Sequence, residues 1–173
     1  MMEERNLDKR LKEFYQEGYQ EDNRLDGDKM HYIEFITTTN YIDKYLNKGD
    51  RILEVGAGTG KYSLYYAKKG YRVDAIELVE ANIEVLKTNI EKNMDIRVEQ
   101  GNALDLSRYK DNTFDITLVL GPLYHLFDKK EQDMAIKEAI RVTKKGGIIY
   151  IAFILFDVVM LSTAFVGGTI NLV

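Results

Sequence analysis

The stretch Ile52-Leu53-Glu54-Val55-Gly56-Ala57-Gly58-Thr59-Gly60-Lys61 decides how the rest of the chain is interpreted. It joins a short apolar run, residues 51–55, which predicts a β-strand, to residues 60–69, which predict a helix. Glycines at alternate positions allow positive φ angles and let a ligand approach the backbone closely. The helix that follows offers unpaired N–H groups and the positive end of its dipole. The loop is therefore expected to bind a carboxylate or a phosphate.

Three glycine-rich motifs differ in what they require around this loop. A P-loop needs glycine in place of Val55 and Ser or Thr in place of Tyr62, although Gly60-Lys61 fits it. A dinucleotide-binding fingerprint needs its third glycine at Lys61. The pattern E-x-G-x-G-x-G is matched at every fixed position, by Glu54, Gly56, Gly58 and Gly60. A turn that binds no ligand is the remaining alternative, and it would leave the carboxylate of Glu54 without a partner at the end of a core strand.

A second acidic residue, Glu77, directly follows the next predicted strand, residues 71–76. In sheets that bind dinucleotides, an acid at this place hydrogen-bonds the ribose hydroxyls. Taken alone, Glu77 would be interpreted as a solvated carboxylate at a strand end. Because it comes one crossover after the glycine loop, Glu77 is predicted to bind a ribose.

Short apolar runs alternate with helical runs from Arg51 onward. Strands are predicted at residues 51–55, 71–76, 96–99, 114–120 and 148–155, and helices at residues 60–69, 80–92 and 129–142, the last of them stopped by Gly146-Gly147. Such alternation indicates parallel βαβ units with right-handed crossovers. The predicted fold is α/β, a doubly wound, mostly parallel, Rossmann-like sheet of strand order 3-2-1-4-5. Ligands bind such a sheet at the carboxyl ends of its strands.

These motifs resemble those of the class I S-adenosylmethionine-dependent methyltransferases, within their broad small-molecule type. The resemblance covers about residues 33 to 153, and four stretches carry it: Ile52–Gly60, Val73–Glu77, Gly101-Asn102-Ala103-Leu104-Asp105-Leu106, and Phe114-Asp115 through Leu120-Gly121-Pro122-Leu123-Tyr124-His125. It implies S-adenosylmethionine as the cofactor, S-adenosylhomocysteine as the product and no metal. It also implies a methyl acceptor, which we expect to be a small molecule.

The resemblance further implies roles for individual residues. Glu54 would neutralise the methionine ammonium group and Glu77 would hold the ribose. Asn102 stands where the family often has an aspartate beside adenine. Because asparagine is favoured in turns, the alternative is that Asn102 only forms a turn. The implied cofactor contacts are Glu54, Gly56, Ala57, Gly58, Gly60, Glu77, Leu78, Asn102, Ala103, Leu120 and Gly121.

The end of the fourth predicted strand should lie under the transferring methyl group. Methyltransferases that act on base amino groups commonly have D/N-P-P-Y/F there, and Leu120-Gly121-Pro122-Leu123 departs from it. His125 is the candidate general base, because histidine titrates near neutral pH, and a surface or structural role is equally compatible with its position. Tyr124 is the other catalytic candidate, as a residue lining the pocket.

Residues 1–49 are charged and have helical spacing, which predicts a helical cap or lid on a cofactor-binding domain at residues 50–173. The candidate lid contacts are Tyr15, Tyr19, Arg24 and Tyr41; for any one of them, the alternative is a cap that only covers the core, through Phe14, Phe35 and Ile36.

The composition excludes several classes of function. The chain has no cysteine and two histidines, so a disulfide framework and a thiolate metal site are excluded. Its net charge is −4 and no basic stripe is visible, which disfavours a nucleic-acid partner. The apolar stretch 148–166 carries Asp157 near its centre, which disfavours a membrane span. The first residues have no apolar core of a secretory signal, and we expect a cytoplasmic protein.

The sheet of this family usually ends with strands six and seven, and the residues after position 155 leave no room for both. The expectation is therefore a fragment, a reduced variant or a sheet completed by another subunit, with an exposed edge that favours a homo-oligomer. Two alternative functions remain. A nicotinamide-dependent oxidoreductase is disfavoured by Lys61, and a cofactor-binding remnant without catalysis is favoured by the short carboxyl terminus.

Overall fold

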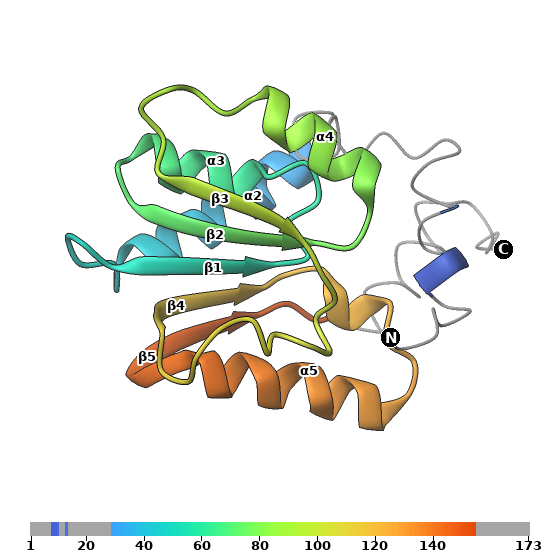
Figure 1. Ribbon diagram of the computed structural model, residues 1–173. Helices are drawn as coiled ribbons and strands as arrows, with labels where there is room; N and C mark the ends of the chain where they lie inside the picture. Colours follow the sequence, from blue (N-terminus) through green and yellow to red (C-terminus); the bar gives the residue numbers. More distant parts are fainter. Residues whose placement is uncertain (1–7, 11–12, 14–28, 155–173) are drawn as a thin grey trace, which may run out of the picture.

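The computed structural model describes residues 8–10, 13 and 29–154. Its elements are α2 (Lys29–Asp43), β1 (Arg51–Val55), α3 (Lys61–Lys68), β2 (Arg72–Glu77), α4 (Glu80–Thr88), β3 (Ile96–Gln100), β4 (Phe114–Val119), the 3-10 helix η2 (Pro122–Tyr124), α5 (Lys129–Val142) and β5 (Thr143–Ile151). The strands form one five-stranded sheet of order β3-β2-β1-β4-β5, and every neighbouring pair is parallel (Figure 1). The predicted fold class and strand order are confirmed.

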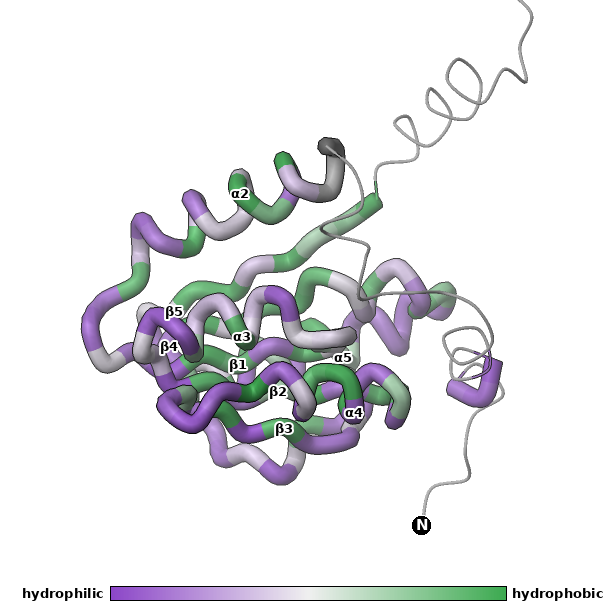
Figure 2. The backbone as a smooth tube through the Cα atoms, turned by 90° about the horizontal axis from the view of Figure 1, so that it is seen from above, coloured by the Kyte–Doolittle hydropathy of each residue, from purple (hydrophilic) through white to green (hydrophobic). Residues whose placement is uncertain are grey.

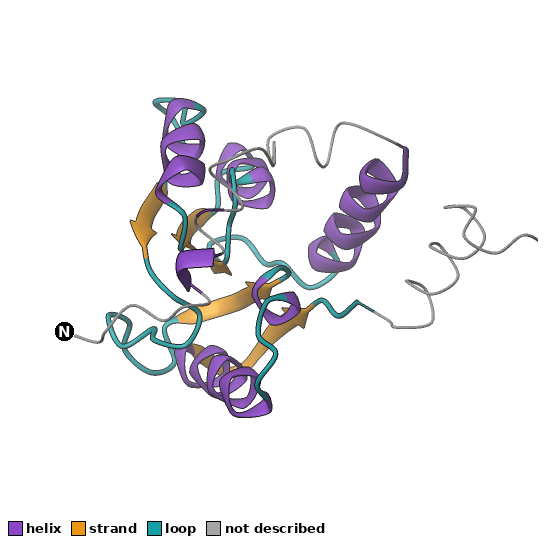
Figure 3. Ribbon diagram, turned by 90° about the vertical axis from the view of Figure 1, so that its right-hand side faces the viewer, coloured by secondary structure: helices purple, strands orange, loops and turns teal. Residues whose placement is uncertain are grey.

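Helices cover both faces of this sheet (Figure 3). On one face, Ile42 of α2 and Tyr66 of α3 pack with Ile52 of β1 in one buried cluster. On the other face, α5 packs against Leu53 of β1 in a second cluster, together with the loop after β3. Ile52 and Leu53 point to opposite faces and both are completely buried. A strand buried on both faces is apolar at nearly every position, which is why these strands could be recognised as continuous apolar runs.

Helix α2 uses only part of its apolar surface against the sheet. Ile42 is completely buried and the ring of Phe35 contacts Tyr62 at a centroid distance of 5.2 Å. Other large apolar side chains of this segment are exposed, namely Tyr32, Ile33, Ile36, Tyr41 and Tyr45. Figure 2 shows hydrophobic residues recurring along α2. The helix ends at Asp43, and Gly49, which has a φ angle of 90°, lies in the turn that leads to β1.

The boundary between α5 and β5 corrects a prediction. Helix α5 ends at Val142, as expected, but β5 begins immediately at Thr143 rather than at residue 148. Gly146-Gly147 lies within β5, where the pairing with β4 shifts its register between Phe114 and Ile116. A Cβ on Gly147 would come within 2.6 Å of the carbonyl oxygen of Asp115. The glycine pair therefore permits a close approach of two strands instead of stopping a helix.

Two predicted ends also differ. Helix α4 ends at Thr88, four residues before the predicted end at residue 92. Strand β5 ends at Ile151, before the predicted end at residue 155. The prediction that strands six and seven are missing concerns residues 156–173, which lie outside the described residues.

In the described part of the chain, no helix has the length and apolar character needed to cross a bilayer. Pairing of the β5 edge with a second copy of the chain stays a prediction.

Candidate functional site

The carboxyl ends of four neighbouring strands bring the predicted cofactor residues together. Val55 at the end of β1 is paired with Ile76 of β2, and Glu77 at the end of β2 is paired with Gln100 of β3. The glycine loop, Glu77 and the Asn102 turn therefore follow one another along a single edge of the sheet. The chain reverses its order between β1 and β4, which is where a doubly wound sheet binds its ligand.

The glycine loop has the unusual backbone that its sequence predicts. Gly56, Gly58 and Gly60 have φ angles of 72°, 56° and 85°, a region that side chains strongly disfavour. The N–H groups of Gly56 and Ala57 both donate to the carbonyl oxygen of Ile76, at 2.7 and 3.0 Å. The loop is thus tied to β2 and ends at Gly60, the N-cap residue of α3.

Two of the three glycines are also required by the packing of the protein itself. A Cβ on Gly56 would come within 2.6 Å of the ring of Pro122, and a Cβ on Gly60 would overlap the side chain of Leu86. Pro122 begins η2 and Leu86 lies on α4, so both neighbours are far from the loop in sequence. No local sequence pattern indicates these contacts, because both partners are distant from the loop along the chain.

Glu54 is buried, with 3% of its surface exposed, and it has a partner that the sequence analysis did not identify. Its Oε2 accepts a hydrogen bond from the backbone N–H of Ser63 at 2.9 Å and one from the Ser63 hydroxyl. Ser63 lies in the first turn of α3, whose N–H groups have no partner within the helix. Glu54 therefore caps α3, and its predicted contact with the methionine ammonium group stays a prediction.

Glu77 joins the glycine loop to α4. Its Oε2 accepts from the N–H of Gly58 at 2.8 Å, and its Oε1 accepts from the N–H of Val79 at 2.9 Å and from Nδ2 of Asn82 at 3.4 Å. Burial raises the pKa of Glu77, although these hydrogen bonds lower it. The side chain is 6% exposed, so the interpretation as a solvated strand-end carboxylate is wrong. Leu78, the next residue, is half-buried, and its carbonyl oxygen accepts from Gln100 at 3.0 Å.

Asn102 forms a turn just beyond β3. Its Oδ1 accepts from the N–H of Leu104 at 3.0 Å, and its Nδ2 donates to Oδ2 of Asp8 at 3.2 Å. The neighbouring Ala103 is buried. Arg141 of α5 holds the rest of the loop by donating to the carbonyl oxygens of Leu106 and Tyr109, at 3.0 and 2.8 Å. Asp8 thus contacts the turn that should face adenine, and Arg141 holds the loop that follows this turn.

The residues after β4 lie at the same edge. Leu120 and Gly121 are half-buried and lead into η2, whose Pro122 contacts the glycine loop. Tyr124 and His125 are also half-buried, and the backbone N–H of His125 donates to the carbonyl oxygen of Pro122 at 3.1 Å. Their catalytic roles stay predictions.

The predicted lid residues are only partly described. Tyr15, Tyr19 and Arg24 lie outside the described residues. Tyr41 is 56% exposed, its ring is covered by Nζ of Lys44 at 4.2 Å, and its carbonyl oxygen accepts from the hydroxyl of Tyr150 at 3.0 Å. These contacts place Tyr41 beside β5, and its role as a cofactor contact stays a prediction.

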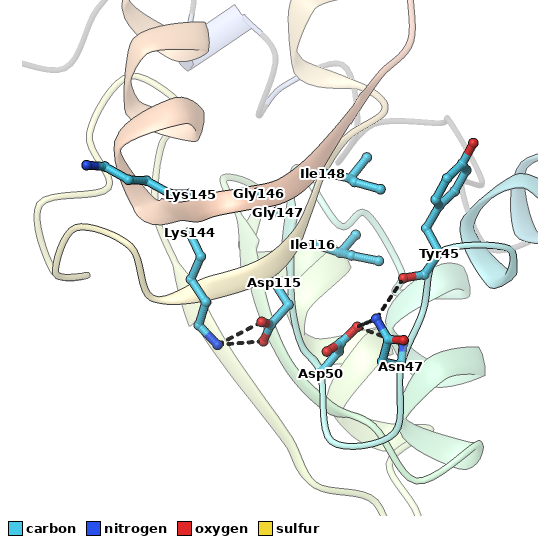
Figure 4. Close-up of a pocket in the computed structure, with 10 residues that line it drawn as sticks. All are labelled: Tyr45, Asn47, Asp50, Asp115, Ile116, Lys144, Lys145, Gly146, Gly147 and Ile148. Atoms are coloured by element: carbon cyan, nitrogen blue, oxygen red, sulfur yellow. Dashed lines mark hydrogen bonds and ion pairs between the residues drawn. The ribbon is translucent and has the colours of Figure 1, made fainter.

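A cavity of 170 Å³ lies at the opposite edge of the sheet, at the amino ends of β1, β4 and β5 (Figure 4). It is lined by Tyr45, Asn47, Asp50, Asp115, Ile116, Lys144, Lys145, Gly146, Gly147 and Ile148. Two of its charged residues are paired with each other, since Nζ of Lys144 contacts both carboxylate oxygens of Asp115, at 2.7 and 2.9 Å. Burial raises the pKa of Asp115, but Lys144 and the N–H of Arg51 outweigh it and hold the pKa below its usual value. Ligands of parallel sheets bind at the other edge, so this cavity is not the candidate site.

Within residues 8–10, 13 and 29–154, no three acidic or histidine side chains are grouped so as to hold a metal ion.

Known proteins resemble both the fold and the loop. The profile of a family described as "Methyltransferase domain" matches residues 53–151, more than half of the chain. The ribosomal protein L11 methyltransferase of Thermotoga neapolitana is 38% identical over 80 residues, 45% of this chain and 29% of that protein. The demethylmenaquinone methyltransferase of Renibacterium salmoninarum is 36% identical over 105 residues, 60% of this chain and 41% of that protein. A crystal structure of an S-adenosylmethionine-dependent methyltransferase from Methanosarcina mazei has 34% identity and a TM-score of 0.59, with 64% of this chain and 55% of that one covered. The chain thus spans less than half the length of these two curated relatives.

Proposed function

The chain belongs to the class I, Rossmann-like family of S-adenosylmethionine-dependent methyltransferases, and we propose that it transfers the methyl group of S-adenosylmethionine to a small-molecule acceptor. The observation that carries this proposal is the arrangement of Gly58 and Glu77. A positive-φ loop at the end of β1 lies within hydrogen-bond distance, 2.8 Å, of a buried acid at the end of β2. The loop after β1 would thus offer backbone groups to the methionine part of the cofactor, and Glu77 at the end of the next strand would offer a carboxylate to the ribose.

The order of the strands gives the proposed order of the cofactor. The glycine loop after β1 would hold the methionine end, Glu77 after β2 would bind the ribose, and Asn102 and Ala103 after β3 would lie beside the adenine. Glu77 already accepts three hydrogen bonds, and ribose hydroxyls can replace the bond from Gly58. Exchange of one donor for another makes the cost of binding small, because the buried carboxylate has the same number of hydrogen-bond donors before and after binding.

Methyl transfer from a sulfonium requires little from the protein except positioning of the acceptor. The methyl group leaves a positively charged sulfonium, so the leaving group departs as a neutral thioether. Holding an acceptor in line with the methyl group then provides most of the rate enhancement, in favourable cases about 7–11 kcal/mol. Leu120 and Gly121, at the end of β4, would form the floor under the methyl group, and His125 would take a proton from acceptors that must lose one.

The acceptor is proposed to be a small molecule on the basis of charge and sequence. The net charge of −4, without a basic stripe, gives no electrostatic support to a nucleic-acid acceptor. The sequence after β4 also departs from the D/N-P-P-Y/F pattern of base-amine methyltransferases. Named relatives include both a quinone-precursor and a ribosomal-protein methyltransferase, so a protein acceptor is the competing proposal.

A cofactor-binding protein without catalysis is the second candidate function. It requires only the glycine loop and Glu77, whose contact at 2.8 Å involves neither of the catalytic candidates, Tyr124 and His125.

Titration calorimetry with S-adenosylmethionine, S-adenosylhomocysteine and NAD tests these functions. We expect both sulfur compounds to bind and NAD not to bind. Binding of NAD alone would replace the proposal with an oxidoreductase. Binding of the sulfur compounds without methyl transfer to quinone-type, carboxylate, amine or peptide acceptors would favour the second candidate.

A further inference from the structure

A buried carboxylate from the start of the chain reaches the place proposed for adenine. Asp8 is 8% exposed, and its Oδ2 accepts from Nδ2 of Asn102, 94 residues away, at 3.2 Å. The short helical piece that contains Asp8 lies beyond the carboxyl ends of the strands (Figures 1 and 3). This contact connects the amino-terminal segment to the cofactor edge of the sheet rather than to its core.

The hydrogen bonds of Asn102 determine what each neighbouring group can offer to a base. The Asn102 oxygen already accepts from the N–H of Leu104, and its amide nitrogen donates to Asp8. An ionised aspartate has no proton to donate and can only accept. The exocyclic amine of adenine can only donate, and adenine carries it on the edge that distinguishes it from a 6-oxo purine.

We propose that Asp8 is an adenine-recognition residue, which accepts a hydrogen bond from the exocyclic amine while Asn102 holds its carboxylate in place. This inference rests on the proposed function, because it assumes that the base lies beside Asn102. It gives Asp8 a role in choosing the cofactor. A hydrogen bond to a charged acceptor is about twice as strong as one between neutral groups. The same carboxylate repels the O6 oxygen of a 6-oxo base, so it favours the amine from both directions.

The test compares S-adenosylhomocysteine with S-inosylhomocysteine, whose base carries an oxygen in place of the amine. Calorimetry measures the affinity of the wild type, Asp8→Asn and Asp8→Ala for both compounds. The matched control is Glu13→Ala, an acidic residue of the same segment whose side chain is 53% exposed and pairs with Lys9 at 3.9 Å. We expect the wild type and the control to prefer the adenosyl compound equally.

Asp8→Ala should weaken binding of the adenosyl compound about tenfold and leave the inosyl compound unchanged or slightly improved. Asp8→Asn keeps the shape of the side chain and adds an amide donor, so it should bind the inosyl compound more tightly than the wild type does. This gain in affinity cannot arise from a variant that merely folds poorly.

Three outcomes would overturn the inference. Equal weakening of both compounds in both variants, with a lower melting temperature, would make Asp8 a structural tether. Tighter binding of both compounds would mean that Asp8 obstructs the site. Variants that match the wild type would mean that Asp8 does not touch the base. If the wild type binds neither compound, the proposed function itself has failed, and that result is distinct from all three.

Discussion

The two edges of the sheet satisfy their buried carboxylates in different ways. At the amino edge, the fully buried Asp74 is paired with the guanidinium group of Arg51, with two hydrogen bonds of 2.9 Å. At the carboxyl edge, Glu77 accepts from two backbone N–H groups and one side-chain amide. Both arrangements meet the requirement that a buried charge be hydrogen-bonded. The partner of Asp74 is a cation, whereas the partners of Glu77 are neutral donors. A ligand that carries neutral donors, such as ribose hydroxyls, can therefore replace a partner of Glu77 but not the partner of Asp74.

This difference separates stability from binding along the same strands. A fork of two hydrogen bonds fixes Asp74 in one geometry and gives the amino edge a structural role. The loop held by Glu77 has positive φ angles at Gly56, Gly58 and Gly60, which are costly for side chains and useful for approach of a ligand. The comparison predicts that variants at the amino edge change the free energy of unfolding, and that variants at the carboxyl edge change cofactor affinity.

The largest effect is expected from Arg51→Ala. Removing the guanidinium group leaves the carboxylate of Asp74 buried without its main partner, which should lower the free energy of unfolding by about 3 kcal/mol. Urea unfolding measures this loss. Cofactor affinity of the folded protein, measured by calorimetry with S-adenosylhomocysteine, should not change.

Lys144→Ala is the matched control at the same edge. Its pair with Asp115 is 46% and 24% exposed, and such pairs contribute about 1 kcal/mol or less. If Arg51→Ala and Lys144→Ala lower the free energy of unfolding equally, burial does not make the Arg51–Asp74 pair more costly to break than an exposed pair. The double variant Arg51→Met with Asp74→Leu should recover most of the stability, because it removes both charges together.

The next largest effect is expected from Gly58→Val. The φ angle of Gly58 is 56° and its N–H lies 2.8 Å from Glu77, so a branched side chain would strain the loop and occupy the path of the cofactor. Binding of S-adenosylmethionine should weaken about 100-fold or more, which corresponds to about 2.7 kcal/mol. Calorimetry measures the affinity.

Gly70→Val separates backbone strain from obstruction of the site. Gly70 has a φ angle of 88° and open space around it, and it lies between α3 and β2 at the other end of the sheet. It should therefore lose stability as Gly58→Val does while binding the cofactor normally. If Gly70→Val also loses binding, the loss at Gly58 reflects general destabilisation and not a blocked site.

The sequence was sufficient to predict the sheet because buried parallel strands are apolar on both faces. β1 and α5 have the predicted bounds, and the strand order is the predicted one, although alternation and right-handed crossovers alone give parallel neighbours without determining their order. The start of β5 was not predictable, because Gly146-Gly147 can either stop a helix or allow two strands to approach. The choice depends on the carbonyl oxygen of Asp115, a contact across the sheet.

The parts of the candidate site that local sequence motifs mark were predictable, and the contacts between distant segments were not. The glycine loop and Glu77 lie at the expected strand ends. Ser63 could have been identified as the partner of Glu54, since it occupies the first turn of the helix that follows the loop. No local pattern could join Asp8 to Asn102, because the two residues are 94 positions apart in the sequence and meet only in the folded protein.

The smallest effect is the pH dependence of Glu77, where stability and binding should change in opposite directions. Burial raises the pKa of Glu77 above its ordinary value despite its hydrogen bonds, so folding favours the protonated form. Its contribution to the free energy of unfolding is therefore fully present below the unfolded pKa, about 4.3, and is lost as the pH rises through the raised value. Ribose hydroxyls donate to the ionised form, so cofactor affinity should rise over the same interval.

Glu77→Gln removes the titrating group, and comparing its unfolding and binding profiles with those of the wild type, from below about pH 4.3 upward, isolates both changes. Relative to the variant, the wild type should lose unfolding free energy and gain cofactor affinity as the pH rises through the raised pKa of Glu77. Profiles that run parallel for the two proteins would remove Glu77 from the binding site. They would also remove the proposed difference between the two edges of the sheet, since Glu77 would then have a structural role, as Asp74 has.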